Sequence, residues 1–142
     1  MVFTLGSFIS GSSMPEHLLT TFRNVFSKIP QRVFWKWEKD AQVVFPPNVV
    51  LLDWLPQQDL LAHPNARLFI SHGGLLGLQE AIYHAVPLLG LPFGNDQHNN
   101  MARAKKEGYA LKLDWGRLNE ENLFQAITTL INDPRLSFLG YI

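Results

Sequence analysis

Residues 54–97 read WLPQQDLLAHPNARLFISHGGLLGLQEAIYHAVPLLGLPFGNDQ, and the centre of this stretch is the tetrapeptide from Ser71 to Gly74. The run Arg67–Ser71 before it is typical of a β-strand, and Leu75–Ala85 after it has helical spacing. Two glycines between a strand and a helix let the backbone turn sharply and approach a ligand closely. The free N–H groups that begin the helix would face that ligand, which indicates an anion site, most often for a phosphate.

The rest of the chain alternates short apolar strands with amphipathic helices. We predict strands at Val2–Leu5, Arg32–Trp37, Val49–Asp53, Arg67–Ser71, Pro87–Leu91 and Tyr109–Leu113. We predict helices at Pro15–Ile29, Pro56–His63, Leu75–Ala85, Asp96–Glu107 and Leu118–Ile131, the last with Asn119 as its N-cap. The third helix should turn five residues to the core, namely Leu75, Leu78, Ala81, Ile82 and Ala85. This alternation predicts an α/β, doubly wound parallel sheet that binds ligands at the carboxyl ends of its strands.

Length and composition restrict the class of protein. At 142 residues the chain has the size of a single domain, residues 1–142. Lysine plus arginine and aspartate plus glutamate number 12 each, so no net charge attracts nucleic acid or a membrane surface. Cysteine is absent, no apolar run is long enough to span a bilayer, and the opening residues do not have the basic start of a signal peptide. Because a strand begins one residue into the chain, we expect it to be part of a longer protein.

His72 has two interpretations, an anion ligand or a capping or half-buried histidine. The glycine pair favours the first, because an imidazole beside a helix start would add a charge-assisted hydrogen bond to a diphosphate. Counting on by fours from His72 gives Leu76 and Glu80 on one helical face, with Glu80 about two turns (~12 Å) from the phosphate end. Glu80 would accept hydrogen bonds from both ribose hydroxyls, or else is a solvated helix carboxylate.

Other candidate ligands follow neighbouring strands. Trp54 precedes a proline at a strand end and would stack on a nucleobase, or else belongs to the core. Gln57 offers an amide to the base edge or the ribose. Asp96 and Gln97 end a polar loop and suit several sugar hydroxyls, although Asp96 would also serve as an N-cap.

Motifs of several other chemistries are missing. No GxGxxG follows a strand, which leaves a nicotinamide-binding domain weakly supported, and no GxxxxGK[ST] is present for a triphosphate. There is no DxD pair to hold a metal-bound diphosphate, no zinc-ligand spacing among the histidines and no GxSxG. We therefore expect no metal and no cofactor.

The order of these motifs resembles the signature region of the UDP-glycosyltransferases, the metazoan UDP-glucuronosyl and UDP-glucosyl transferase family. The matching segments are FTLGS from Phe3, IPQRVFWKW from Ile29, WLPQQDLLAHP from Trp54, SHGG from Ser71, QEAIYH from Gln79, NDQ from Asn95 and INDP from Ile131. The resemblance implies the Rossmann-like, C-terminal donor-binding domain of the GT-B glycosyltransferase fold. It also implies an N-terminal acceptor domain and a C-terminal membrane helix, which these residues do not include, and attachment to the endoplasmic reticulum membrane.

Matched residue by residue, the resemblance assigns each part of a UDP-sugar. Trp54 would lie against the uracil, Gln57 near the uridine and Glu80 on the ribose. The diphosphate and the sugar would be bound by a larger set: His72, Gly73 and Gly74 at the diphosphate, Asp96 and Gln97 on the transferred sugar, and Ser7 with Thr4 in a loop that closes over the diphosphate. Gly77 is a further expected substrate-binding residue.

The resemblance also implies the reaction. The family transfers a hexosyl or glucuronosyl group from a UDP-sugar to a small lipophilic acceptor by inverting displacement, without a metal. His72 would stabilise the leaving group, while the general base would be a histidine of the N-terminal half. Leu76 and Lys36 replace the family's usual asparagine and arginine, which affects donor affinity and sugar choice. A non-catalytic UDP-sugar-binding or partner-docking module, an NAD-binding domain and a homo-oligomer all stay open.

Overall fold

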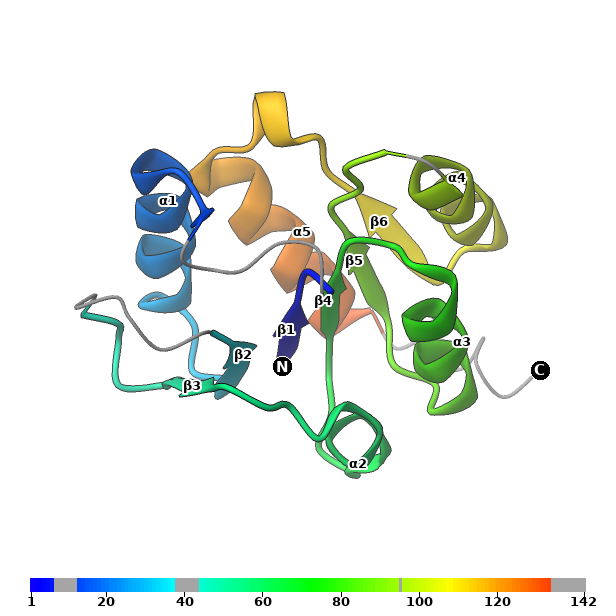
Figure 1. The fold of residues 1–142 in the computed structure, drawn as a ribbon, viewed down its shortest axis with the longest axis horizontal. Helices are drawn as coiled ribbons and strands as arrows, with labels where there is room; N and C mark the ends of the chain where they lie inside the picture. Colours follow the sequence, from blue (N-terminus) through cyan, green and yellow to red (C-terminus); the bar gives the residue numbers. More distant parts are fainter. Residues whose placement is uncertain (7–12, 38–43, 95, 134–142) are drawn as a thin grey trace.

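A computed structural model describes residues 1–6, 13–37, 44–94 and 96–133. Its six strands form one parallel sheet in the order β3-β2-β1-β4-β5-β6, as Figure 1 shows. The strands are β1 (Val2–Thr4), β2 (Val33–Lys36), β3 (Val49–Leu52), β4 (Phe69–Ser71), β5 (Leu88–Gly90) and β6 (Ala110–Lys112). The predicted doubly wound sheet is thereby confirmed.

The order in which strands are added to the sheet reverses between β1 and β4. Strands β2 and β3 extend it on the β1 side, and β5 and β6 extend it on the β4 side. The register pairs Val2 with Phe69 and Thr4 with Ser71, so both strands end at the same level. In doubly wound sheets the crevice at such a switch point is where ligands bind, and the SHGG tetrapeptide begins with the last residue of β4.

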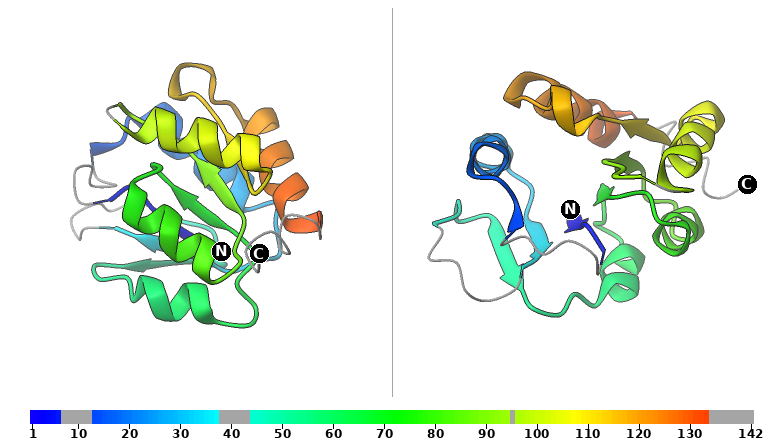
Figure 2. Two further views of the ribbon diagram at one scale, coloured as in Figure 1. Left: turned by 90° about the vertical axis from the view of Figure 1, so that its right-hand side faces the viewer. Right: turned by 45° about the horizontal axis from the view of Figure 1, so that its top comes forward.

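Helices cover both faces of the sheet (Figures 1 and 2). The helices are α1 (Glu16–Phe26), α2 (Gln57–Ala62), α3 (Leu75–Tyr83), α4 (Asp96–Glu107) and α5 (Glu120–Asn132). Helices α1 and α5 pack on an aromatic core around Phe3, Phe22 and Trp35. Helices α2, α3 and α4 enclose a second core that includes Phe69 and Met101. Because both faces are covered, the strands are mostly apolar, and their polar residues are the last ones of β1, β2, β4 and β6, namely Thr4, Lys36, Ser71 and Lys112.

Some local predictions are confirmed and others are wrong. Asn119 caps α5 in a reciprocal capping box with Asn122, as predicted for the cap residue. Leu75 does not face the core: it is the first residue of α3 and its side chain is 53% exposed. Helix α3 also ends at Tyr83, before Ala85, whose φ of 56° is left-handed and stops the helix. The short 3-10 helix at Trp115–Arg117 was not predicted.

Candidate functional site

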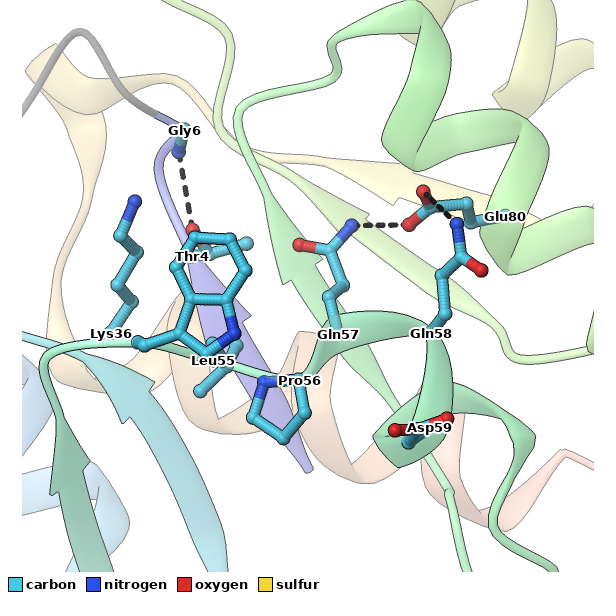
Figure 3. A pocket seen from close by; sticks show the side chains of 10 residues that line it. Thr4, Gly6, Lys36, Leu55, Pro56, Gln57, Gln58, Asp59 and Glu80 are labelled. Carbon is cyan, nitrogen blue, oxygen red and sulfur yellow. Dashed lines mark hydrogen bonds between the residues drawn. The ribbon is translucent and has the colours of Figure 1, made fainter.

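A pocket of about 540 Å³ opens at the carboxyl ends of β1, β2 and β3, beside the switch point (Figure 3). Its lining residues come from four separate parts of the chain: Thr4, Gly6, Lys36, Trp54, Leu55, Pro56, Gln57, Gln58, Asp59 and Glu80. The sequence-based hypothesis placed Trp54, Gln57 and Glu80 on one nucleoside, and the fold brings these three together in a volume that suits a small ligand.

Trp54 is a surface residue of this pocket. Its side chain is 79% exposed, so the alternative in which it belongs to the core is wrong. It follows β3, and the two residues after it restrain its backbone, because Leu55 is buried and Pro56 restricts the backbone just before α2. An exposed indole on a fixed backbone offers its face for stacking on a planar ring.

Glu80 on α3 accepts hydrogen bonds from two side chains of the neighbouring helix α2. Gln57 Nε2 donates to Glu80 Oε2 at 2.6 Å, and Gln58 Nε2 donates to Glu80 Oε1 at 3.2 Å (Figure 3). The carboxylate is therefore held in place at the pocket wall rather than free in solvent. Gln58 was not among the predicted site residues, since its contact with Glu80 spans 22 positions of sequence and depends on how α2 packs against α3.

The prediction that His72, Leu76 and Glu80 share one face of a helix is wrong for His72. Helix α3 begins at Leu75, so His72 lies in the preceding turn and does not share a helical face with Glu80. Leu76, the intermediate position, is 70% exposed. Glu80 reaches the pocket through its contacts with α2, which the helical period alone did not reveal.

The imidazole of His72 lies between two glycines. A methyl group on Gly6 would come within 2.7 Å of the ring, and one on Gly74 within 2.6 Å of Nε2. Because Gly6 also lines the pocket, His72 adjoins the pocket at the end of β1. No side chain caps α3, so the capping role considered for His72 is wrong, while its half-buried state is confirmed.

Burial lowers the pKa of His72 below its usual 6.5, and the negative charge of Asp96 opposes this effect. Its Nδ1 atom is buried and has no hydrogen-bond partner among the described residues. The first backbone bond inside α3 runs from the Leu78 N–H to the Gly74 carbonyl, so the preceding N–H groups have no partner within the helix. The imidazole therefore lies beside the start of α3, whose N–H groups are the kind of donors that bind anions.

The predicted glycines have distinct roles. Gly73 has a φ of +88°, and a methyl group there would lie 2.7 Å from Met101 Cγ, so the tight turn depends on glycine. At Gly77 a methyl group would lie 3.3 Å from the Phe69 ring and 3.7 Å from Gln57 Nε2. Gly77 therefore keeps α3 close to β4 and next to a pocket residue.

Asp96 and Gln97 are the first two residues of α4, and the charge of Asp96 acts on His72. Asp96 is the first helical residue, not the residue that precedes the helix, and its Oδ2 accepts a hydrogen bond from Asn100 Nδ2 at 3.2 Å. The same Asn100 amide donates to the Gly73 carbonyl at 3.0 Å. Gln97 Oε1 accepts from the Phe93 N–H at 2.8 Å and from the Gly94 N–H at 3.4 Å. The part of the Gln97 side chain that could contact a sugar is therefore its NH₂ group. Asn100 was assigned no role from sequence, although its spacing of four from Asp96 was a signal.

The remaining predicted residues are Thr4, Lys36 and Ser7. Thr4 is buried, and its Oγ1 accepts a hydrogen bond from the Gly6 N–H at 3.3 Å, which shapes the turn after β1. Lys36 lines the pocket (Figure 3). Ser7 lies outside the described residues. Over the part of the chain that the structure describes, no three His, Asp or Glu side chains gather as metal ligands.

A parallel sheet of this order, covered by helices on both faces and with a pocket beside its switch point, defines a doubly wound, Rossmann-like α/β domain. The chain matches the family described as UDP-glucoronosyl and UDP-glucosyl transferase over residues 1–138, and it belongs to that family.

Relatives and solved structures agree with this assignment. The chain is 44% identical over 133 residues to UDP-glycosyltransferase UGT5 of Dactylopius coccus, covering 94% of the chain and 25% of that protein. It is 40% identical over 134 residues to UDP-glucuronosyltransferase 2B10 of Homo sapiens, with the same two coverages. The glycosyltransferase of kitacinnamycin superposes with a TM-score of 0.87 at 28% identity, over 99% of this chain and 36% of that one.

A further solved structure contains a nucleotide. Glycosyltransferase VinC, solved in complex with dTDP, superposes with a TM-score of 0.81 at 25% identity, over 99% of this chain and 35% of that one. The domain therefore has the Rossmann-like fold found in GT-B glycosyltransferases. The chain spans about a quarter of the length of the curated relatives that it matches. No helix in the described ranges is both long and apolar enough to cross a bilayer.

Proposed function

We propose that this chain is the donor-binding half of a UDP-glycosyltransferase. The observation that carries the proposal is the meeting of Trp54, Gln57 and Glu80 in one pocket, with His72 next to it at the switch point. The indole would stack on the uracil, and Glu80, held by Gln57, would accept hydrogen bonds from the ribose. The diphosphate would lie against His72 and the start of α3.

The sugar would extend from the diphosphate towards α4. There Asp96 offers a carboxylate as acceptor and Gln97 offers its side-chain NH₂ as donor, a combination that suits several hydroxyls of one hexose. Asn100 connects Asp96 to the Gly73 carbonyl, so the groups assigned to the sugar and to the phosphates are directly connected. Glucose and glucuronate are both candidates for the transferred group.

The role of this half in the reaction is to stabilise the leaving group. As an acceptor oxygen attacks the anomeric carbon with inversion, negative charge develops on the departing UDP. N–H groups and an imidazole that are already in position stabilise that charge more in the transition state than in the ground state. We place the general base, and the site for a small lipophilic acceptor, in the part of the relatives that this chain does not cover. Attachment to the endoplasmic reticulum membrane and independence of metals also stay predictions.

Isothermal titration calorimetry with UDP, UDP-glucose, UDP-glucuronate and NAD tests the proposal. We expect binding of UDP and at least one UDP-sugar, with no binding of NAD. No heat and no competition at millimolar UDP would refute it, and preferential binding of NAD would indicate a nicotinamide domain instead. A transfer assay with an added N-terminal domain from a relative then separates a donor-binding half-enzyme from a non-catalytic binding module.

A further inference from the structure

Glu80 has an unusual pair of partners. Each of its two carboxylate oxygens accepts one side-chain amide N–H, and the two donors are the consecutive residues Gln57 and Gln58 (Figure 3). Glu80 is half-buried on α3, while both glutamines belong to the first turn of α2. The two amides therefore fix both oxygens, and with them the plane of the carboxylate.

The backbone that carries the two glutamines is itself anchored. The Gln57 N–H donates to the Leu55 carbonyl at 2.7 Å, and the Leu60 N–H donates to the Pro56 carbonyl at 2.9 Å. Leu61 on the other side of α2 is buried in the core. The first turn of α2 is thus a fixed base from which both amides reach across to α3.

The chemistry of the partners determines what else Glu80 can bind. An ionised carboxylate has about four acceptor positions, two on each oxygen. One position on each oxygen is occupied by an amide, which leaves one on each for a further donor. The amides are neutral, so they orient the carboxylate without cancelling its charge, unlike an arginine or lysine partner. Two adjacent hydroxyl groups, each donating to one oxygen, complete this arrangement.

We propose that Gln58 is a positioning residue that makes the site selective for ribonucleotides over deoxyribonucleotides. The inference rests on the proposed function, in which Glu80 faces the ribose of UDP. Gln58 holds Oε1 in the plane that lets each oxygen face one hydroxyl of the 2′,3′-diol. Without Gln58 the carboxylate turns about its side-chain bond, with only the Gln57 bond to restrain it, and one hydroxyl loses its acceptor.

The test compares the affinities of UDP, 2′-deoxy-UDP and 3′-deoxy-UDP by calorimetry. The wild-type chain should bind UDP about 10-fold or more tightly than each deoxy compound, since a carboxylate loses one donor in each case. In Gln58→Ala, the discrimination against at least one deoxy compound should fall about 3- to 10-fold, the range expected for one hydrogen bond. Gln58→Glu replaces the amide donor with a second negative charge beside Glu80, and it should lower the discrimination between UDP and the deoxy compounds at least as much.

Gln79→Ala is the matched control. Gln79 is an exposed glutamine next to Glu80 on α3, but it neither lines the pocket nor donates a hydrogen bond to Glu80. Its discrimination should equal that of the wild type, and thermal unfolding should show that all variants fold.

The outcomes separate the inference from the proposed function. If UDP binds but Gln58→Ala keeps the full discrimination against both deoxy compounds, the positioning role is refuted and the UDP site stands. An equal loss of discrimination in Gln79→Ala also refutes the positioning role, because the effect then comes from any change near Glu80 and not from the Gln58 hydrogen bond. If the wild-type chain binds no UDP, the proposed function and the inference both fall.

Discussion

Replacing Gly74 with alanine would move the imidazole of His72 without disturbing the backbone. Gly74 has φ −63° and ψ 145°, an extended conformation that alanine adopts without strain. The added methyl group would lie 2.6 Å from His72 Nε2. Gly6 and Gly73 are less suitable for this experiment, because their φ values of 77° and 88° would add backbone strain.

The magnitude follows from the contact distance. To reach an ordinary van der Waals separation of about 3.5 Å, the ring has to move by about 1 Å. Such a displacement breaks a hydrogen bond from His72 to a diphosphate, because a donor–acceptor distance near 2.9 Å becomes nearly 4 Å. A hydrogen bond to a charged group contributes about 1.5–3 kcal/mol, so UDP should bind roughly 10- to 150-fold more weakly in Gly74→Ala.

The free energy of unfolding is measured separately from the affinity. Alanine in place of glycine reduces the conformational entropy of the unfolded chain, which stabilises the fold by about 0.4–1 kcal/mol. Alanine is a poorer N-cap than glycine, and displacing a half-buried ring that also adjoins Gly6 costs about 1–3 kcal/mol of packing energy. We therefore expect a net destabilisation of about 0–3 kcal/mol, measured by urea unfolding, with the variant still folded. Gly116→Ala is the control, since a methyl group there meets nothing within 4 Å.

A double-mutant cycle decides whether the effect acts through the imidazole. In a His72→Ala background the ring is gone, and Gly74→Ala should cause no further loss of UDP affinity. An unchanged affinity in the single Gly74→Ala variant would refute the role of His72 as a diphosphate ligand. A loss of the same size in both backgrounds would also refute it, since the methyl group would then act on the helix start alone.

Three further predictions concern the parts of the proposed ligand. Because the free protein has a His72 pKa below 6.5 and a bound diphosphate would raise it, the affinity for UDP-glucose should increase as pH falls between the bound and free pKa values, with a slope of at most about one log unit per pH unit. His72→Gln should abolish the slope, and a slope retained in that variant would contradict the assignment. Trp54→Ala should weaken UDP binding by about 1–3 kcal/mol, whereas Tyr83→Ala, which removes an aromatic side chain that is 82% exposed outside the pocket, should not. Asp96→Ala should weaken UDP-glucose more than UDP in calorimetry, and equal losses for both ligands would refute its sugar role.

The sequence was sufficient for the strands, the helices and their order in outline. Apolar runs bounded by glycine and proline have the length of strands, and residues such as Leu123 and Ile127 recur at helical spacing, so local physics determines these elements. The predicted ends were less accurate. Leu75 has the right spacing for the core, but it belongs to the first turn of its helix, where tertiary packing decides which side chains are covered.

The sequence predicted several residues of the candidate site but neither Gln58 and Asn100 nor the contacts between elements. Strand ends placed Trp54, His72 and Asp96 at one edge of the sheet, because parallel strands bring their carboxyl ends together. The contacts of Gln58 with Glu80 and of Asn100 with Gly73 join separate elements. Such contacts depend on the packing of one helix against its neighbour, for which a single sequence holds no periodic signal.

The lowered pKa of His72 makes the charge of the site depend on its ligand. A lysine or arginine in this place would be charged whether or not a ligand is bound. Burial keeps the imidazole uncharged in the free protein, while Asp96 favours its protonation. On the proposed function, the charge of the ligand itself raises the pKa of His72, so the full electrostatic attraction exists only while a diphosphate is present. Asn100 donates to both Asp96 and the Gly73 carbonyl, so on the same proposal a single side chain fixes the residue assigned to the sugar relative to the turn assigned to the diphosphate.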